Sequence, residues 1–93
     1  MKTIKLIEHV DPVNESGVIF KLNYLMPKIF AATQNNEKIL LDLDGAFGYP
    51  ICFLEDTFKG LSTNFDVFGT LVFKCNDEPD LIDTIKDLMV TQI

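Results

Sequence analysis

The sequence predicts an α/β fold with a four-stranded mixed sheet and three helices, in the order strand, strand, helix, strand, helix, strand, helix. Two observations support this class. Apolar residues make up 47% of the 93 residues, enough to fill a core. Short apolar runs also alternate with segments whose apolar residues recur every three or four positions. A chain of this length is expected to form a single domain, residues 1–93, with a modest core.

The chain opens with two predicted strands. Residues 2–8 alternate in polarity, as a strand does, and residues 11–17 are rich in turn formers. Residues 17–22 also alternate, so we expect a second, short strand that pairs with the first as a hairpin. The face of this strand that repeats every second residue consists of Val18, Phe20 and Leu22.

A helix and the central strand come next. Asn23 can cap a helix over residues 24–34, and Pro27 falls in its first turn. Its predicted inward stripe is Leu22, Met26, Ile29, Phe30 and Ala32. Residues 38–44 form a nearly uninterrupted apolar run, the pattern of a central strand. A right-handed parallel crossover would then join the second and third strands.

The stretch after the central strand predicts a loop and an amphipathic helix. Residues 45–49 form the loop, and the helix begins at Pro50 and ends near Gly60. Its apolar stripe is Ile51, Leu54, Phe58 and Leu61, and the opposite side carries Glu55, Asp56 and Lys59.

The last part of the chain predicts a loop, a strand and a helix. Residues 61–68 are polar and read as the loop, and residues 69–75 read as the fourth strand. Residues 76–79 combine a cap with a proline, which is typical of a helix start. The apolar face of this helix is Leu81, Ile82, Ile85, Leu88 and Met89.

Charge and hydropathy exclude several function classes. The formal charge of −6 disfavours nucleic-acid backbones and anionic membrane surfaces. No apolar run approaches the roughly 20 residues that span a bilayer, and the first ten residues alternate with charge, unlike a signal peptide. We expect a cytoplasmic protein that binds neither nucleic acid nor membrane.

The two cysteines predict no metal or redox site. Cys52 and Cys75 lack CxxC spacing and have apolar neighbours, so both are expected to be reduced and packed. Cys52 opens the helix after the central strand, where the helix terminus could instead lower its pKa and make it reactive. His9 is the only histidine and is expected to be a loop residue.

One motif suggests an enzyme. Asp42, Leu43, Asp44 and Gly45 resemble the nucleophile motif of haloacid-dehalogenase-like phosphatases, in which Asp42 would attack phosphate and Asp44 would act as acid and base around Mg²⁺. Ala46 departs from that motif, and too little chain follows it. A structural turn is therefore favoured over the phosphatase. A metal site shared by these aspartates with Glu55 and Asp56 is disfavoured, because the helix pair faces solvent.

The residues from Asp42 to Ala46, Phe53 and the run Glu55 to Phe58 resemble the bacterial STAS-like domain family of unknown function. A second match runs from Leu71 to Ile82, so the resemblance covers about residues 17–89. This family is related to the anti-sigma-factor antagonists. The resemblance implies a regulatory module, not an enzyme, without cofactor or metal, whose partner is a histidine-kinase-like ATPase or another regulator.

The resemblance also implies where a partner binds: the loop and helix after the central strand. The corresponding residues are Gly48, Tyr49, Pro50, Ile51, Cys52, Phe53, Glu55, Asp56 and Lys59. Relatives carry phosphorylatable serines before this helix, whereas this chain has Pro50, Ile51 and Cys52. No phosphoacceptor is assigned. Without these serines the loop would be a constitutive binding surface, or the domain would serve another contact. A third hypothesis is a structural homodimer that associates through Val18, Phe20 or Ile4 if one sheet face is open.

Overall fold

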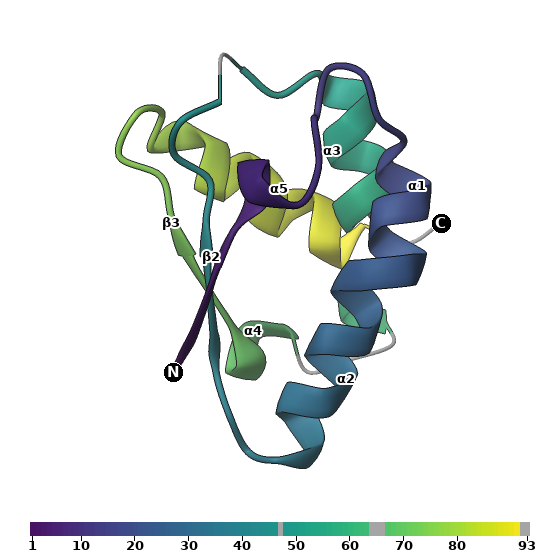
Figure 1. The fold of residues 1–93 in the computed structure, drawn as a ribbon, viewed down its shortest axis with the longest axis vertical. Coiled ribbons are helices and arrows are strands. Elements are labelled where there is room, and N and C mark those ends of the chain that lie inside the picture. Colours follow the sequence, from purple (N-terminus) through teal and green to yellow (C-terminus); the bar gives the residue numbers. More distant parts are fainter. Residues whose placement is uncertain (47, 64–66, 92–93) are drawn as a thin grey trace.

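A computed structural model describes residues 1–46, 48–63 and 67–91. Its sheet contains β1 (Lys2–Lys5), β2 (Ile39–Asp42) and β3 (Leu71–Lys74) in the order β1-β2-β3, and both strand pairs are parallel. The prediction that residues 38–44 contain the central strand is therefore confirmed, since β2 lies between β1 and β3. The four-stranded mixed sheet of STAS type is wrong, because the described chain forms a three-stranded, all-parallel sheet (Figure 1).

The segment that was predicted to form the second strand is helical. Residues 17–34 run as α1 (Gly17–Phe20), a π-helical turn (Lys21–Leu25) and α2 (Met26–Gln34) without interruption. The predicted strand over residues 17–22 and its hairpin with the first strand are therefore wrong. This helical segment instead connects β1 to the parallel strand β2, as a crossover requires.

The π-helical turn explains the misreading. The Met26 N–H donates to the Lys21 carbonyl, five residues earlier. The turn adds one residue to the helical repeat, so the buried side chains of Phe20 and Leu25 are five positions apart. The expected spacing of three or four is lost at this point, and the remaining pattern looks like alternation.

The same extra residue rotates the predicted inward stripe. Ile29 and Ala32 are buried as expected, and Met26 is partly buried. Leu22 and Phe30, which were expected to face inward, are 57% and 54% exposed. One of these two side chains, Leu22, becomes part of the candidate site described below.

The other predicted elements occur with shorter bounds. A 3-10 turn, Leu6–Glu8, follows β1 where the strand was expected to continue. The two later helices are α3 (Ile51–Phe58) and α5 (Asp80–Val90). The predicted loop over residues 61–68 contains a 3-10 turn, Leu61–Thr63, and the start of a short helix, α4 (Val67–Thr70); residues 64–66 lie outside the described part.

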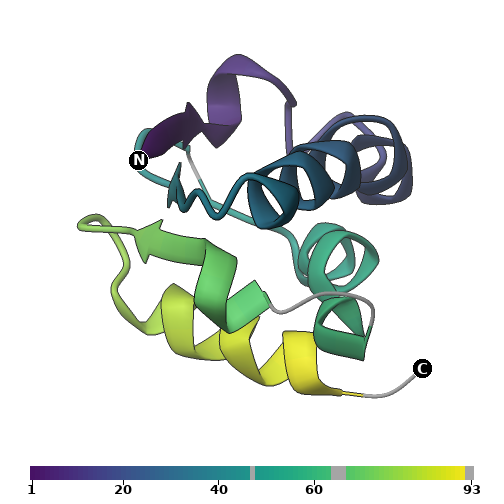
Figure 2. The same cartoon turned by 90° about the horizontal axis from the view of Figure 1, so that it is seen from below.

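The helices lie on one side of the sheet (Figure 2). On that side β2 contributes buried Ile39 and Leu41, and the register places Ile4 and Phe73 on either side of Leu41. The last helix presents the predicted apolar face to this core. Its buried residues are Leu81, Ile85 and Met89, and its partly buried ones are Ile82 and Leu88. None of the helices in the described ranges has the length and apolar character needed to cross a membrane.

The opposite sheet face is largely open. Thr3 and Val72 are exposed there, and Leu40, which lies between them in the register, is half-buried. The next row contains Lys5, Asp42 and Lys74. Parallel sheets usually have both faces covered, so this open face is a structural exception.

Candidate functional site

The outer side of α3 carries most of the residues predicted to bind a partner. Ile51, Cys52, Glu55 and Asp56 are exposed, and Lys59 is half-buried. The sequence placed Ile51 both in the apolar stripe and at the contact surface. At 57% exposure it belongs to the surface, so its place in the buried stripe is wrong.

Phe53 belongs to the core, contrary to its predicted role as a contact residue. Its side chain is 2% exposed, and its ring lies 6.4 Å from that of Phe20 and 6.3 Å from that of Tyr49. Because α3 turns about 100° per residue, Phe53 points inward while Ile51 and Cys52 point outward. Phe53 therefore holds α3 in place and is not available to a partner.

The loop before α3 is anchored by Tyr49. Its hydroxyl donates to the Leu43 carbonyl at 2.7 Å, and burial, Cys75 and nearby carboxylates raise the pKa of the phenol. Gly48 and Pro50 on either side are half-buried, and Gly48 has a φ of +140°, a conformation that favours glycine. Tyr49 thus positions the start of α3, and its buried hydroxyl is already bonded.

A close contact between α1 and α3 sets the spacing of the two helices. A Cβ at Gly17 would lie 2.8 Å from the Phe53 carbonyl oxygen, 2.6 Å from Thr57 Oγ1 and 3.0 Å from Asp56 Cβ. Only glycine allows this approach, because a carbonyl in the middle of a helix has no freedom to move away. The helices therefore meet directly at Gly17 and leave a solvent-exposed furrow beside the contact.

This furrow is the candidate site, and we call it the α1–α3 groove. It has a volume of about 290 Å³. Its lining residues are Val18, Lys21, Leu22, Glu55, Asp56 and Lys59. Val18 and Leu22 are 45% and 57% exposed and form the apolar wall. The sequence identified the α3 wall but missed the opposite one, because residues 17–22 were read as a strand.

The charged side chains of the groove differ in the contacts that they already make within the chain. The Lys21 ammonium donates to the Lys59 carbonyl at 3.2 Å, so it caps the carboxyl end of α3. Glu55 and Asp56 make no ion pair with any residue in the described part of the chain. The groove therefore presents an apolar wall on one side, and two carboxylates without an ion pair together with Lys59 on the other.

The aspartates of the phosphatase-like motif serve as backbone caps. Asp44 Oδ1 accepts the N–H groups of Asn76 at 2.6 Å and Asp77 at 3.0 Å. In return, Asp77 accepts the Gly45 N–H at 3.0 Å. Asp42 Oδ1 accepts the Asp44 N–H at 3.0 Å. These bonds join the loop after β2 to the loop after β3, which supports the structural interpretation of the motif.

The alternative of a metal site formed by Asp42, Asp44, Glu55 and Asp56 finds no suitable arrangement of ligands among the described residues. No group of three or more His, Cys, Asp or Glu side chains there is arranged to hold a metal ion. Asp42 lies beside Lys74, with 3.8 Å between the carboxylate and the ammonium, whereas Glu55 lines the groove. The two aspartates and the helix pair thus occupy different places.

The two cysteines differ in environment. Cys52 is exposed, so its predicted burial is wrong: it lies on the outer side of α3, one turn before Glu55. Cys75 is buried as expected, and burial raises the pKa of its thiol. Neither cysteine forms a disulfide in the structure.

The sequence also missed the contacts of His9. Its ring stacks on Tyr24 with 4.6 Å between centroids, and its Nε2 lies 3.2 Å from the Tyr24 hydroxyl. Tyr24 in turn stacks on Phe20 at 5.5 Å. A histidine and a tyrosine fifteen positions apart show no local sequence signal, and their meeting depends on the helical path of residues 17–25.

The homodimer hypothesis needs different residues. Phe20 and Ile4 are 5% and 1% exposed, so neither can contact a second copy, and Val18 lies on a helix instead of the sheet. The open sheet face carries Leu40 and Val72 instead. Three strands of four residues cover only about 200 Å², whereas a standard interface buries about 800 Å² per partner. This face alone is too small for a stable dimer.

Comparisons of the chain with protein-family models, with curated proteins and with solved structures give no match. The geometry and the charges of the groove are therefore the basis for a function.

Proposed function

We propose that this chain is a non-enzymatic protein-interaction domain whose α1–α3 groove binds a basic amphipathic helix of a partner protein. The single observation that carries the proposal is the combination, in one groove, of exposed apolar side chains on one wall and unpaired carboxylates on the other.

The spacing of the groove residues fits a helical segment. Val18 and Leu22 are four positions apart across the π-helical turn, and Glu55 and Asp56 lie on the facing helix. A helix placed in the groove would bury apolar residues at positions i and i+4 against Val18 and Leu22. Its lysine or arginine residues on one flank would reach the carboxylates of Glu55 and Asp56.

Electrostatics favour a basic partner. The chain has a formal charge of −6, which attracts cationic surfaces at a distance. The groove lining carries two carboxylates, Glu55 and Asp56, and two ammonium groups, Lys21 and Lys59, and the Lys21 ammonium also donates to the Lys59 carbonyl. The preference for a basic partner therefore comes from the overall negative charge of the chain and from the two carboxylates on α3, which make no ion pair among the described residues.

The partner implied by the STAS-like resemblance is a histidine-kinase-like ATPase or another regulator. The fold does not support carrying this partner over, because the described residues form a three-stranded parallel sheet instead of the expected four-stranded mixed one. We therefore identify the partner by its chemistry, and an ATPase qualifies if it presents a basic amphipathic helix. A cytoplasmic site for this interaction is part of the proposal, and the acidic composition is compatible with it.

A peptide selection tests the proposal. A display library of helix-forming 18-residue peptides is selected separately on the native chain and on the double variant Glu55→Lys, Asp56→Lys. The native chain should enrich peptides with apolar residues at i and i+4 and with lysine or arginine on one flank. The charge-reversed variant should enrich the same apolar pattern with aspartate or glutamate instead.

Leu22→Asp is the matched control for the apolar wall. Leu22 is exposed, so this substitution should leave the fold intact, which circular dichroism checks. Peptides selected on the native chain should bind this variant at least about tenfold more weakly, because an apolar contact is lost. Enrichment of the same peptides by the native and charge-reversed chains would contradict the proposal, as would full binding to Leu22→Asp.

A further inference from the structure

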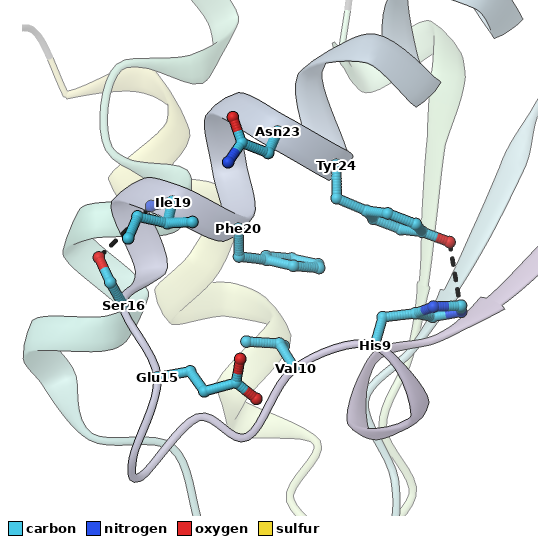
Figure 3. Close-up of a pocket in the computed structure, with 8 residues that line it drawn as sticks. All are labelled: His9, Val10, Glu15, Ser16, Ile19, Phe20, Asn23 and Tyr24. Atoms are coloured by element: carbon cyan, nitrogen blue, oxygen red, sulfur yellow. Dashed lines mark hydrogen bonds between the residues drawn. The ribbon is translucent and has the colours of Figure 1, made fainter.

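The opposite side of the α1 helical segment borders a second cavity (Figure 3). This cavity has a volume of about 390 Å³ and lies just beyond the carboxyl end of β1. Its lining residues are His9, Val10, Glu15, Ser16, Ile19, Phe20, Asn23 and Tyr24. Its size falls in the range of small-molecule sites.

The geometry points to a binding site for a small amphipathic amine, a molecule with an apolar body and one protonated nitrogen. We call this cavity the Glu15 pocket. It shares no lining residue with the α1–α3 groove, because its helical residues lie on the other side of the same segment. The inference does not depend on the function proposed above.

The apolar body has a preformed surface. Val10 and Phe20 are buried and form the floor, and Ile19 stands at the rim with 61% of its side chain exposed. Figure 3 shows the Phe20 ring between Val10 and Tyr24. The rings of Phe20 and Tyr24 are stacked, with 5.5 Å between centroids and 20° between planes, so they add aromatic surface beside the floor. A small aromatic or branched alkyl group fits such a surface without displacing core residues.

The protonated nitrogen has one matching partner. Among the lining residues that the structure describes, Glu15 supplies the single carboxylate. Its Oε1 accepts the Asp11 N–H at 2.8 Å, which fixes the side chain at the rim and leaves Oε2 for a ligand. Figure 3 shows this carboxylate beside Val10, next to the apolar floor.

The charged groups near the pocket, Asp11 and Lys28, already have other contacts, so Glu15 is the residue available to bind the protonated nitrogen. The Asp11 carboxylate is held by the Val13 N–H at 3.0 Å and by the Asn14 amide at 2.8 Å. These bonds favour the charged form and lower the pKa of Asp11. The Lys28 ammonium lies over the Tyr24 ring, 5.4 Å from its centroid, and among the described residues it forms no ion pair with Glu15. An amine therefore meets a fixed carboxylate, whereas a carboxylic acid would be repelled.

Two-dimensional NMR with three matched probes tests the site. Benzylamine, benzyl alcohol and benzoate share the ring and differ in charge. Benzylamine should shift the amide signals of Val10, Ile19 and Tyr24 in a saturable manner. Its affinity should exceed that of benzyl alcohol by about three- to fivefold, as expected for one partly exposed ion pair. Benzoate should bind more weakly than either.

Glu15→Gln is the decisive variant. The glutamine oxygen can still accept the Asp11 N–H, so the loop should keep its shape while the charge is removed. The preference for benzylamine over benzyl alcohol should then disappear. Ile19→Ala should weaken all three probes, because it removes apolar contact that is exposed and not needed for the core.

Glu55→Gln is the matched control, since it removes a carboxylate from the groove and none from the Glu15 pocket. It should leave benzylamine binding unchanged. Equal affinities for the three probes, shifts centred outside the pocket, or no saturable shift of the pocket amides would each overturn the inference. The peptide selection described above would be unaffected by that result.

Discussion

The Cα of Gly17 faces the Phe53 carbonyl across the α1–α3 contact so closely that an added Cβ would lie 2.8 Å from the oxygen. This contact fixes the distance between the two walls of the α1–α3 groove. Val18 follows Gly17 directly, and Asp56 flanks the contact on the other helix. The shape of the candidate site therefore depends on one residue without a side chain.

Gly17→Ala should separate the two helices. We expect a loss of about 1–3 kcal/mol in the free energy of unfolding, as for other overpacked positions. Urea unfolding followed by circular dichroism measures it. Combining this change with Thr57→Ala should not restore stability, because the Phe53 carbonyl still blocks the methyl group. Full recovery in the double variant would show that Thr57 Oγ1, and not the backbone, limits the approach.

Asp44 should matter for stability through its hydrogen bonds and not through its charge alone. Asp44→Ala removes the acceptor for two backbone N–H groups and should cost about 2 kcal/mol. Asp44→Asn retains an accepting oxygen and should cost less than half as much. Thermal unfolding of both variants gives the comparison. Equal losses would show that the charge of Asp44, and not its accepting oxygen, supplies the stability. A Mg²⁺-dependent phosphatase activity that Asp42→Asn abolishes would favour the enzyme alternative.

Alkaline pH should destabilise the fold. The pKa values of Tyr49 and Cys75 are raised in the folded state, so the folded chain holds both protons more tightly than the unfolded chain does. Their stabilising contribution is complete below the unfolded pKa values of about 8.5 for Cys and 10 for Tyr, and is lost as pH rises above them.

The Tyr49→Phe variant isolates one of the two groups. It should lose about 1 kcal/mol at pH 7, because the bond to the Leu43 carbonyl disappears. Its stability should then fall less steeply than that of the native chain between pH 9 and pH 11, a range that brackets the unfolded tyrosine pKa of about 10. Urea midpoints measured across this range check the slope. Parallel slopes would mean that Tyr49 ionises equally in both states.

The two thiols should react at very different rates. Cys52 is exposed and should react with a disulfide reagent in the folded protein, whereas buried Cys75 should react only after unfolding. A domain stabilised by about 5 kcal/mol protects such a group roughly a thousandfold or more. Counting modified thiols over time measures both rates, and Cys52→Ser should remove the fast phase. A fast phase that survives this substitution would show that Cys75 is accessible.

The sequence predicted some elements well because their signals are local. The apolar run over residues 38–44 gave the central strand, and the pattern of Leu81, Ile85 and Met89 gave the last helix. The outward positions of Glu55 and Asp56 also followed from helical spacing. In each case neighbouring residues along the chain carry the whole pattern.

The prediction of a second strand over residues 17–22 was wrong for a physical reason that residue spacing alone does not reveal. A π-helical turn is stabilised by tertiary packing, and its extra residue breaks the repeat between Phe20 and Leu25. Ser16 offered a signal that was missed, because its Oγ accepts the Ile19 N–H as a helix cap. With residues 17–22 read as helix, the apolar wall of the groove could have been predicted as well.

The most direct measurement is an NMR titration of the labelled chain with two 18-residue helical peptides that share leucines at i and i+4. One carries lysine on its flank and the other glutamate. We expect that only the lysine peptide shifts the amides of Val18, Leu22, Glu55 and Asp56, and that Leu22→Asp abolishes the response. Equal responses to both peptides, or shifts centred on Leu40 and Val72 of the open sheet face, would contradict it.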